Sequence, residues 1–240
     1  MRLLDLGTCA VLELAYSKAV PYRLDLTKLS ASELERLIPK SQLLAVRASI
    51  ATSRFLKRPM LASDPYPDSL ELAIAEEADW DNLGASVQDA VAVKAQRDLL
   101  FKMGFNQVGA FKVLGLPYPR HFFAYAKDAD TFAALYLSDA AGIKPYVEMY
   151  TQFRQIKDGL SGIVTSSADL LELDPSPRWI WLHLAGKDAE IVFQLHRSKV
   201  MQYGKANKSA RTEEDFKSVY LEVVRANYAT WLERGVLVRA

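Results

Sequence analysis

Residues 178–197 constrain the fold more than any other part of this chain. Two runs, RWIWLHLA and EIVFQLHR, are rich in aromatic and β-branched residues and flank the four residues GKDA. This pattern is typical of a β-hairpin with a short loop. Pairing Ala185 with Glu190 makes one face of the hairpin wholly apolar, which fixes the register. The opposite face then carries two tryptophans and two histidines: Trp179, Trp181, His183 and His196.

The hydrophobic pattern changes along the chain from a helical to an alternating period. Strands are expected over residues 121–126, 131–138, 146–153 and 162–167 and in the two arms of the hairpin. Short polar links such as KDAD favour an antiparallel meander. The sequence therefore predicts an α+β fold, in which a sheet of about six strands in residues 105–204 is packed by N-terminal helices and one C-terminal helix. Residues 1–104 and 105–240 form two regions, or a single domain spans residues 1–240.

Capping signals mark where helices begin. Ser30 and Glu33 fit a capping box, and Thr212 precedes three acids that suit the first turn of a final helix. Three prolines in residues 58–69 predict a loop. Further helices are expected over residues 41–57, 70–78 and 85–103, whereas residues 1–25 fit a strand or a short buried helix equally well.

Composition limits the classes of protein that this chain can belong to. No apolar run approaches the roughly 18 to 20 residues that a membrane span needs, and the N-terminus is a poor signal peptide. We therefore expect a soluble, cytoplasmic protein. The single cysteine, Cys9, excludes an internal disulfide and is expected to be a small buried side chain. A net charge of +1 gives no overall field that would attract nucleic acid.

The familiar loop and metal motifs are absent. All three histidines fall on predicted strands, so candidate catalytic residues are sought on the sheet. The expected registers place His121 opposite Tyr136 and Glu148 beside Tyr136. A histidine, a phenol and a carboxylate in one row can transfer protons, with Glu148 orienting its neighbours. A half-buried sheet face with no catalytic role is the alternative interpretation.

Aromatic residues on the same face suggest a ligand-binding surface. Tyrosine and tryptophan combine a large contact area with a polar group, which suits a flat ligand, a sugar or a partner protein. The candidates for this surface are Tyr125, Tyr146, Tyr150, Trp179, Trp181, His183 and His196. Helices of the same chain that cover this face are the favoured alternative. In the hairpin, His183 and His196 lie on the order of 13 Å apart, which is too far for both to bind one metal ion. We expect no metal and no cofactor.

Charge is distributed unevenly along the chain. Residues 1–58 hold ten Lys and Arg against five Asp and Glu, whereas residues 59–93 hold eight acids and no base. Two stretches of the chain are basic. Residues 47–58 contain Arg47, Arg54 and Arg58, and residues 197–211 contain five bases with Tyr203 among them. Both have the composition of a site for phosphate or single-stranded nucleic acid, although solvated segments have the same composition.

Three functions follow from these observations. The first is a non-catalytic binding or protein-interaction module that uses the aromatic sheet face or the charged N-terminal helical region. The alternatives are a small-molecule hydrolase or isomerase that uses the His/Tyr/Glu row, and a phosphate- or nucleic-acid-binding protein. The expected partner is a protein or a small molecule, nucleic acid is disfavoured, no membrane is involved, and a homo-oligomer is compatible with the sequence.

Overall fold

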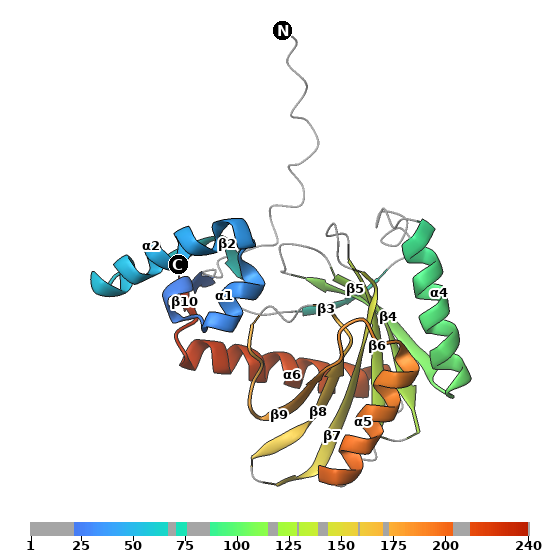
Figure 1. Cartoon of the computed structure of the whole chain (residues 1–240). Helices are drawn as coiled ribbons and strands as arrows, with labels where there is room; N and C mark the ends of the chain where they lie inside the picture. Colours follow the sequence, from blue (N-terminus) through green and yellow to red (C-terminus); the bar gives the residue numbers. More distant parts are fainter. Residues whose placement is uncertain are drawn as a thin grey trace, which may run out of the picture.

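The computed structural model describes residues 22–66, 71–75, 87–114, 120–128, 130–138, 144–157, 159–169, 173–203 and 212–239. A large sheet forms the centre of the molecule, and a small sheet with two helices lies at one end of it (Figure 1). Cys9 lies outside the described residues.

The large sheet has seven strands, each hydrogen-bonded to the next in the order of the sequence. They are β3 (Glu71–Ile74), β4 (Asn106–Leu114), β5 (Arg120–Lys127), β6 (Thr131–Ser138), β7 (Tyr146–Lys157), β8 (Leu160–Ser166) and β9 (Trp179–His183). All neighbours are antiparallel except β8 and β9, which are parallel. This arrangement confirms the predicted α+β class and its mainly antiparallel sheet.

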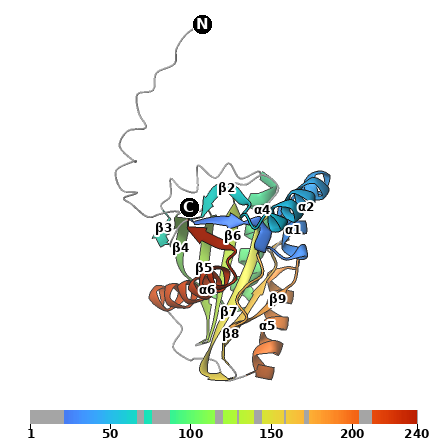
Figure 2. The same cartoon turned by 90° about the vertical axis from the view of Figure 1, so that its left-hand side faces the viewer.

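Helices cover both faces of the large sheet. Helix α6 (Glu213–Glu233) lies on one face, whereas α4 (Val87–Lys102) and α5 (Ala189–Tyr203) pack on the other. Figure 2 shows α6 and α5 on opposite sides of the strands. The stripe Phe216, Val219, Tyr220 and Val223 buries α6 against the sheet, and Thr212 caps the helix as the sequence predicts. The predicted covering of the sheet by helices is therefore confirmed.

The small sheet joins segments from both ends of the described chain. Strand β1 (Tyr22–Asp25) lies between β10 (Leu237–Arg239) and β2 (Leu61–Tyr66). The 3-10 helix η1 (Leu26–Lys28), α1 (Ala31–Leu37) and α2 (Lys40–Phe55) follow β1 in sequence. The capping box predicted at Ser30 and Glu33 is present. Apolar side chains of these elements and of α6 form one core, so segments on both sides of residue 104 share it.

The predicted hairpin at residues 178–197 is wrong. Its first arm is β9, but that strand pairs in parallel with β8, and its second arm is the first part of helix α5. Asp188 begins this helix, because its carboxylate accepts a hydrogen bond from the Ile191 amide (2.9 Å). The buried residues of α5 then follow a helical period: Ala189, Val192, His196 and Val200.

Two other predicted elements need correction, and one strand was not predicted. The proline-rich segment expected as a loop contains β2, an edge strand of the small sheet, where proline is tolerated because one side of the strand needs no ladder hydrogen bond. Residues 71–74, within a predicted helix, form β3 because they pair with β4. Strand β4 itself lies between the predicted helix 85–103 and the first predicted strand, and the sequence pattern did not indicate it.

Candidate functional site

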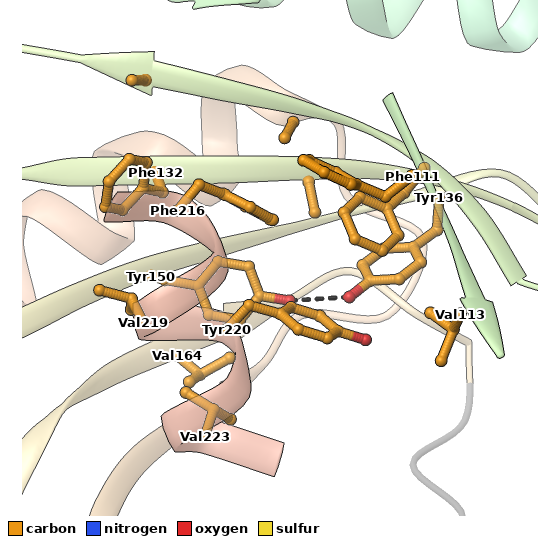
Figure 3. Close-up of a cluster of buried hydrophobic side chains, with 14 of the residues drawn as sticks. Phe111, Val113, Phe132, Tyr136, Tyr150, Val164, Phe216, Val219, Tyr220 and Val223 are labelled. Atoms are coloured by element: carbon orange, nitrogen blue, oxygen red, sulfur yellow. Dashed lines mark hydrogen bonds between the residues drawn. The ribbon is translucent and has the colours of Figure 1, made fainter. Parts of the chain in front are cut away.

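The aromatic face that the sequence suggests as a binding surface is the core beneath α6. Phe216 and Tyr220 of that helix lie against aromatic rings from four strands (Figure 3). Ring centroids are 5.7 Å apart for Phe111 and Phe216 and 5.3 Å apart for Phe122 and Tyr220. The two candidates Tyr146 and Tyr150 belong to this cluster, as do Trp179 and Trp181. These aromatic side chains therefore stabilise the packing of α6 on the sheet.

A chain of hydroxyl groups runs through this core. The Tyr136 and Tyr150 hydroxyl oxygens are 2.9 Å apart, as the dashed line in Figure 3 marks. Tyr150 donates to the Glu148 carboxylate, with 2.5 Å between Oη and Oε2. Two residues of the predicted catalytic row, Tyr136 and Glu148, are thus connected, but through Tyr150 rather than directly. Burial, and then nearby tyrosines and Glu148, raise the pKa of Tyr136 and Tyr150 well above the ordinary tyrosine value.

His121 does not join this chain of hydroxyl groups, so the predicted row is wrong in its register. It lies opposite Leu137, and Phe122 takes the place opposite Tyr136. The observed pairing is one residue from the expected one, which turns His121 to the other face of the sheet. The difference arises because β5 extends to Lys127, which pairs with Thr131, so the connecting loop has three residues instead of four. Asp128 adopts a φ of 55° at the start of that loop.

The remaining ligand-binding candidates are distributed over the two faces. Tyr125 is fully buried on the face under α4 and α5, away from Tyr150. His183 is exposed, and its Nε2 lies 2.6 Å from the Ala168 carbonyl oxygen. The structure therefore does not bring the seven candidates together into one surface.

His196 lies in the interior, between α5 and the sheet. Its two ring nitrogens are 2.9 Å and 2.8 Å from the hydroxyl oxygens of Thr151 and Thr165. Burial, followed by the charge of Arg197, lowers the pKa of His196 to about 3. The imidazole is therefore neutral at physiological pH and joins two strands to α5 through hydrogen bonds.

A buried ion pair connects α1 to the end of α6. The Glu33 carboxylate accepts hydrogen bonds from both terminal nitrogens of Arg234, at 3.0 Å and 2.6 Å, and from the amides of Ser30 and Asp174 at 2.8 Å each. Its side chain is fully buried. Every oxygen of the carboxylate thus has two donors, which marks a structural role for Glu33 rather than a catalytic one.

The first basic stretch makes contacts within the chain. Arg47 forms an ion pair with Glu35 (2.6 Å), and Arg54 donates to the backbone carbonyls of Thr27 and Leu29. In the described part of the second stretch, Arg197 pairs with Asp130 (3.2 Å). Residues 204–211 of that stretch lie outside the described residues. Three of the predicted phosphate-binding arginines therefore have partners in the fold.

The exposed side of α2 is an apolar surface that the sequence analysis did not single out. On one side of the helix Ile50 is buried and Leu43 and Val46 are partly buried, whereas on the other side Leu44 is 83% and Phe55 86% exposed. We call the exposed, uncharged side the outer face of α2; its residues are Ser41, Leu44, Ala45, Ala48, Ala51, Thr52, Phe55 and Leu56. The helix projects from the rest of the molecule in both views (Figures 1 and 2).

A signal for the outer face exists in the sequence. Leu44, Ala48, Ala51 and Phe55 are spaced by four, three and four residues, which places them on one line along a helix. The broad apolar stripe expected for residues 41–57 is in fact two stripes on opposite sides, one buried and one exposed. The total hydrophobicity of the segment does not distinguish the two stripes, but the angular positions of the residues around the helix axis do.

Within the described residues, the fold offers neither a metal site nor a membrane span. No group of three or more His, Cys, Asp or Glu side chains there is arranged to hold a metal ion. None of the described helices combines the length and the apolar character that crossing a bilayer requires. In comparisons with known proteins, no family model, no curated protein and no solved structure matches the chain.

Proposed function

We propose that this protein is a non-catalytic protein-interaction module and that the outer face of α2 is its binding surface. The observation that carries the proposal is the exposure of Leu44 and Phe55 on a helix whose other side is already packed. Exposed apolar side chains that form a continuous patch are typical of interaction sites, whereas isolated ones are not. An apolar line along a helix is the feature that another helix recognises.

The absence of charge on this face supports the same function. Eight exposed residues of α2 and its C-cap carry no charged group. Arg47 and Arg54 border the face on one side, and both guanidinium groups are engaged within the chain. An interface centre depleted of charge is characteristic of protein–protein contacts, because burying an unpaired charge is costly.

Catalysis by the predicted row has less support. A general base needs a pKa near the working pH, but burial raises the pKa of Tyr136 and Tyr150 far above it. His121 lies on the opposite face of the sheet. Phosphate binding has less support as well, because Arg47, Arg54 and Arg197 have partners within the chain.

Photo-crosslinking in the cells that produce the protein tests the proposed function. A benzophenone amino acid replaces Phe55, and in a control it replaces Tyr203, an aromatic residue of α5 that is 41% exposed. We expect a discrete covalent adduct with a protein from position 55 and none from position 203. The substitution Ala51→Glu in the same chain should remove the adduct. An adduct of equal yield from both positions, or none from position 55, would contradict an interaction through α2.

A further inference from the structure

We propose that the occupant of the outer face of α2 is the same face of a second copy of the chain, with the two α2 helices antiparallel. This inference rests on the proposed function and deepens it by naming the partner. The order of side-chain sizes along the helix carries the argument. Large residues, Leu44 and Phe55, lie at the ends of the line, and two alanines, Ala48 and Ala51, lie between them.

A two-fold axis makes this order self-complementary. In an antiparallel pair centred between residues 49 and 50, Leu44 of one copy lies opposite Phe55 of the other, and Ala48 lies opposite Ala51. The alanines allow the helix axes to approach closely, while the large residues at both ends pack across the interface. A closed two-fold dimer requires such a patch, in which each residue contacts its counterpart in both directions.

Charge favours the antiparallel orientation over the parallel one. Lys40 begins α2, and Lys57 and Arg58 follow its C-terminus. A parallel pair would place Lys57 and Arg58 of both copies together, so that four cations meet at one end of the dimer. An antiparallel pair brings Lys40 of one copy beside Lys57 and Arg58 of the other, so that each end of the dimer holds three cations instead of four at one end and two at the other. It also aligns the helix dipoles favourably. The outer face itself contributes no charge to either arrangement.

The size of the face sets the expected strength of the dimer. Helix α2 has 16 residues and is therefore about 24 Å long. Its outer face, with eight residues, is smaller than the roughly 20 to 30 residues that each partner contributes to a standard interface. Leu56, which is 54% exposed, adds a third large apolar side chain at the C-terminal end of this face. The dimer is accordingly expected to dissociate in the micromolar range.

Sedimentation velocity of the full chain over a concentration series tests the proposal. The mass should rise from 26.9 kDa toward twice that value. Leu44→Glu and Ala51→Glu should each weaken the association at least tenfold, because the first places a charge at the end of the line and the second places one near its centre. The matched substitutions Leu195→Glu on α5 and Ala229→Glu on α6, also at exposed positions, should leave it unchanged.

Ala48→Leu distinguishes a packed helix pair from unspecific adhesion. The added side chain makes the surface more apolar, so unspecific association would become stronger. In the proposed dimer it would separate the two helices where they are closest, and the association would become weaker. Because Ala48 is exposed, this substitution leaves the packing of the single chain intact. A monomer at all concentrations, or stronger association with Ala48→Leu, would overturn the proposal.

Disulfide crosslinking tests the orientation. In a chain with Cys9→Ser, Leu44→Cys and Phe55→Cys, mild oxidation should yield dimers whose linked peptides join position 44 to position 55. Links from position 44 to position 44 would overturn the antiparallel arrangement. The identity of the molecule that the benzophenone at position 55 links to distinguishes the homodimer from the more general proposed function. An adduct with another protein would keep the interaction module and overturn the homodimer, and a link to residues 1–20 of the same chain would overturn both.

Discussion

Glu33 and Arg234 are 201 positions apart in the sequence and form a bidentate ion pair that connects α1 to the end of α6. Burial alone would raise the pKa of Glu33, but the hydrogen bonds from Arg234 and from the amides of Ser30 and Asp174 outweigh it and lower the pKa to about 2. The unfolded chain therefore binds a proton at Glu33 more readily than the folded one does.

Removing the charge of Glu33 should destabilise the protein at neutral pH. We expect Glu33→Gln to lower the free energy of unfolding by about 2 to 3 kcal/mol, because it leaves the partly buried Arg234 without its counter-ion. The ionic contribution is fully present above pH 4.5 and is lost as the pH falls toward 2, so the difference between variant and wild type should shrink over that range. Urea unfolding of both proteins at several pH values measures this difference in the free energy of unfolding.

The exposed ion pair between Glu35 of α1 and Arg47 of α2 provides a control only two residues from Glu33. Glu35→Gln should change the free energy of unfolding by no more than about 0.5 kcal/mol, because solvent screens the pair. Equal losses for Glu33→Gln and Glu35→Gln would contradict the structural role of Glu33.

His196 should make the protein less stable as the pH falls from 6.5 toward 3. The folded chain keeps the imidazole neutral, with a pKa of about 3, whereas the unfolded chain binds a proton near pH 6.5. Within this window His196 lowers the free energy of unfolding by up to about 1.4 kcal/mol for each pH unit. His196→Gln, which cannot ionise, should therefore flatten the dependence of stability on pH between 6.5 and 4.5. A variant with the slope of the wild type would rule out this role.

Gly162 should not tolerate a side chain. A Cβ atom there would lie 2.2 Å from the Thr151 carbonyl oxygen and 2.4 Å from the Trp179 ring. Because neither neighbour is a flexible chain end, we expect Gly162→Ala to lower the free energy of unfolding by about 3 kcal/mol or more. Gly159→Ala is a useful comparison: nothing lies within 4 Å of its Cβ position, and its cost of about 1 kcal/mol should come from a φ of 78° alone. Thermal unfolding of both variants tests the difference, and similar losses would contradict the steric argument.

Three tyrosines should resist ionisation in the folded protein. Burial raises the pKa of Tyr125 to about 12, and the pKa of Tyr136 and Tyr150 is raised well above the ordinary value of 10. Titration of the phenolate absorbance between pH 10 and 12 should therefore reveal fewer ionised groups in the folded chain than in denaturant. Tyr150→Phe should reduce this difference. A full complement of ionised tyrosines at pH 11 in the folded state would contradict the buried chain of hydroxyl groups.

The sequence predicts best those elements that local signals define. The capping boxes at Ser30 and Thr212 mark helix starts, and both helices begin there, because the side chains that satisfy the first amides are neighbours in sequence. The meander from β5 to β8 follows from alternation and short links. The register between β5 and β6 fails by one residue, because it depends on the backbone conformation of Asp128 in the turn.

The predicted hairpin fails because its second half fits two periods. In residues 190–197, Ile191, Phe193 and Leu195 alternate as in a strand, while Val192 and His196 lie four residues apart as in a helix. The packing of α5 on the sheet decides between the two, because the helical period buries Val192 and His196 on one side, where His196 contacts Thr151 of β7 and Thr165 of β8. Such long-range contacts have no signature in the local sequence, so the sequence could not correct the face that the hairpin was expected to present.

The small sheet has a consequence for how the protein is made. Strand β1 needs β10 as its partner, and β10 includes Leu237 and Arg239. During synthesis, β1 leaves the ribosome more than 200 residues before that partner does, so this sheet cannot be completed until translation of residue 239 has finished. The strands of the large sheet pair mainly with the next strand in the sequence, so that sheet has no such delay. We expect it to fold first, while β1 is still unpaired.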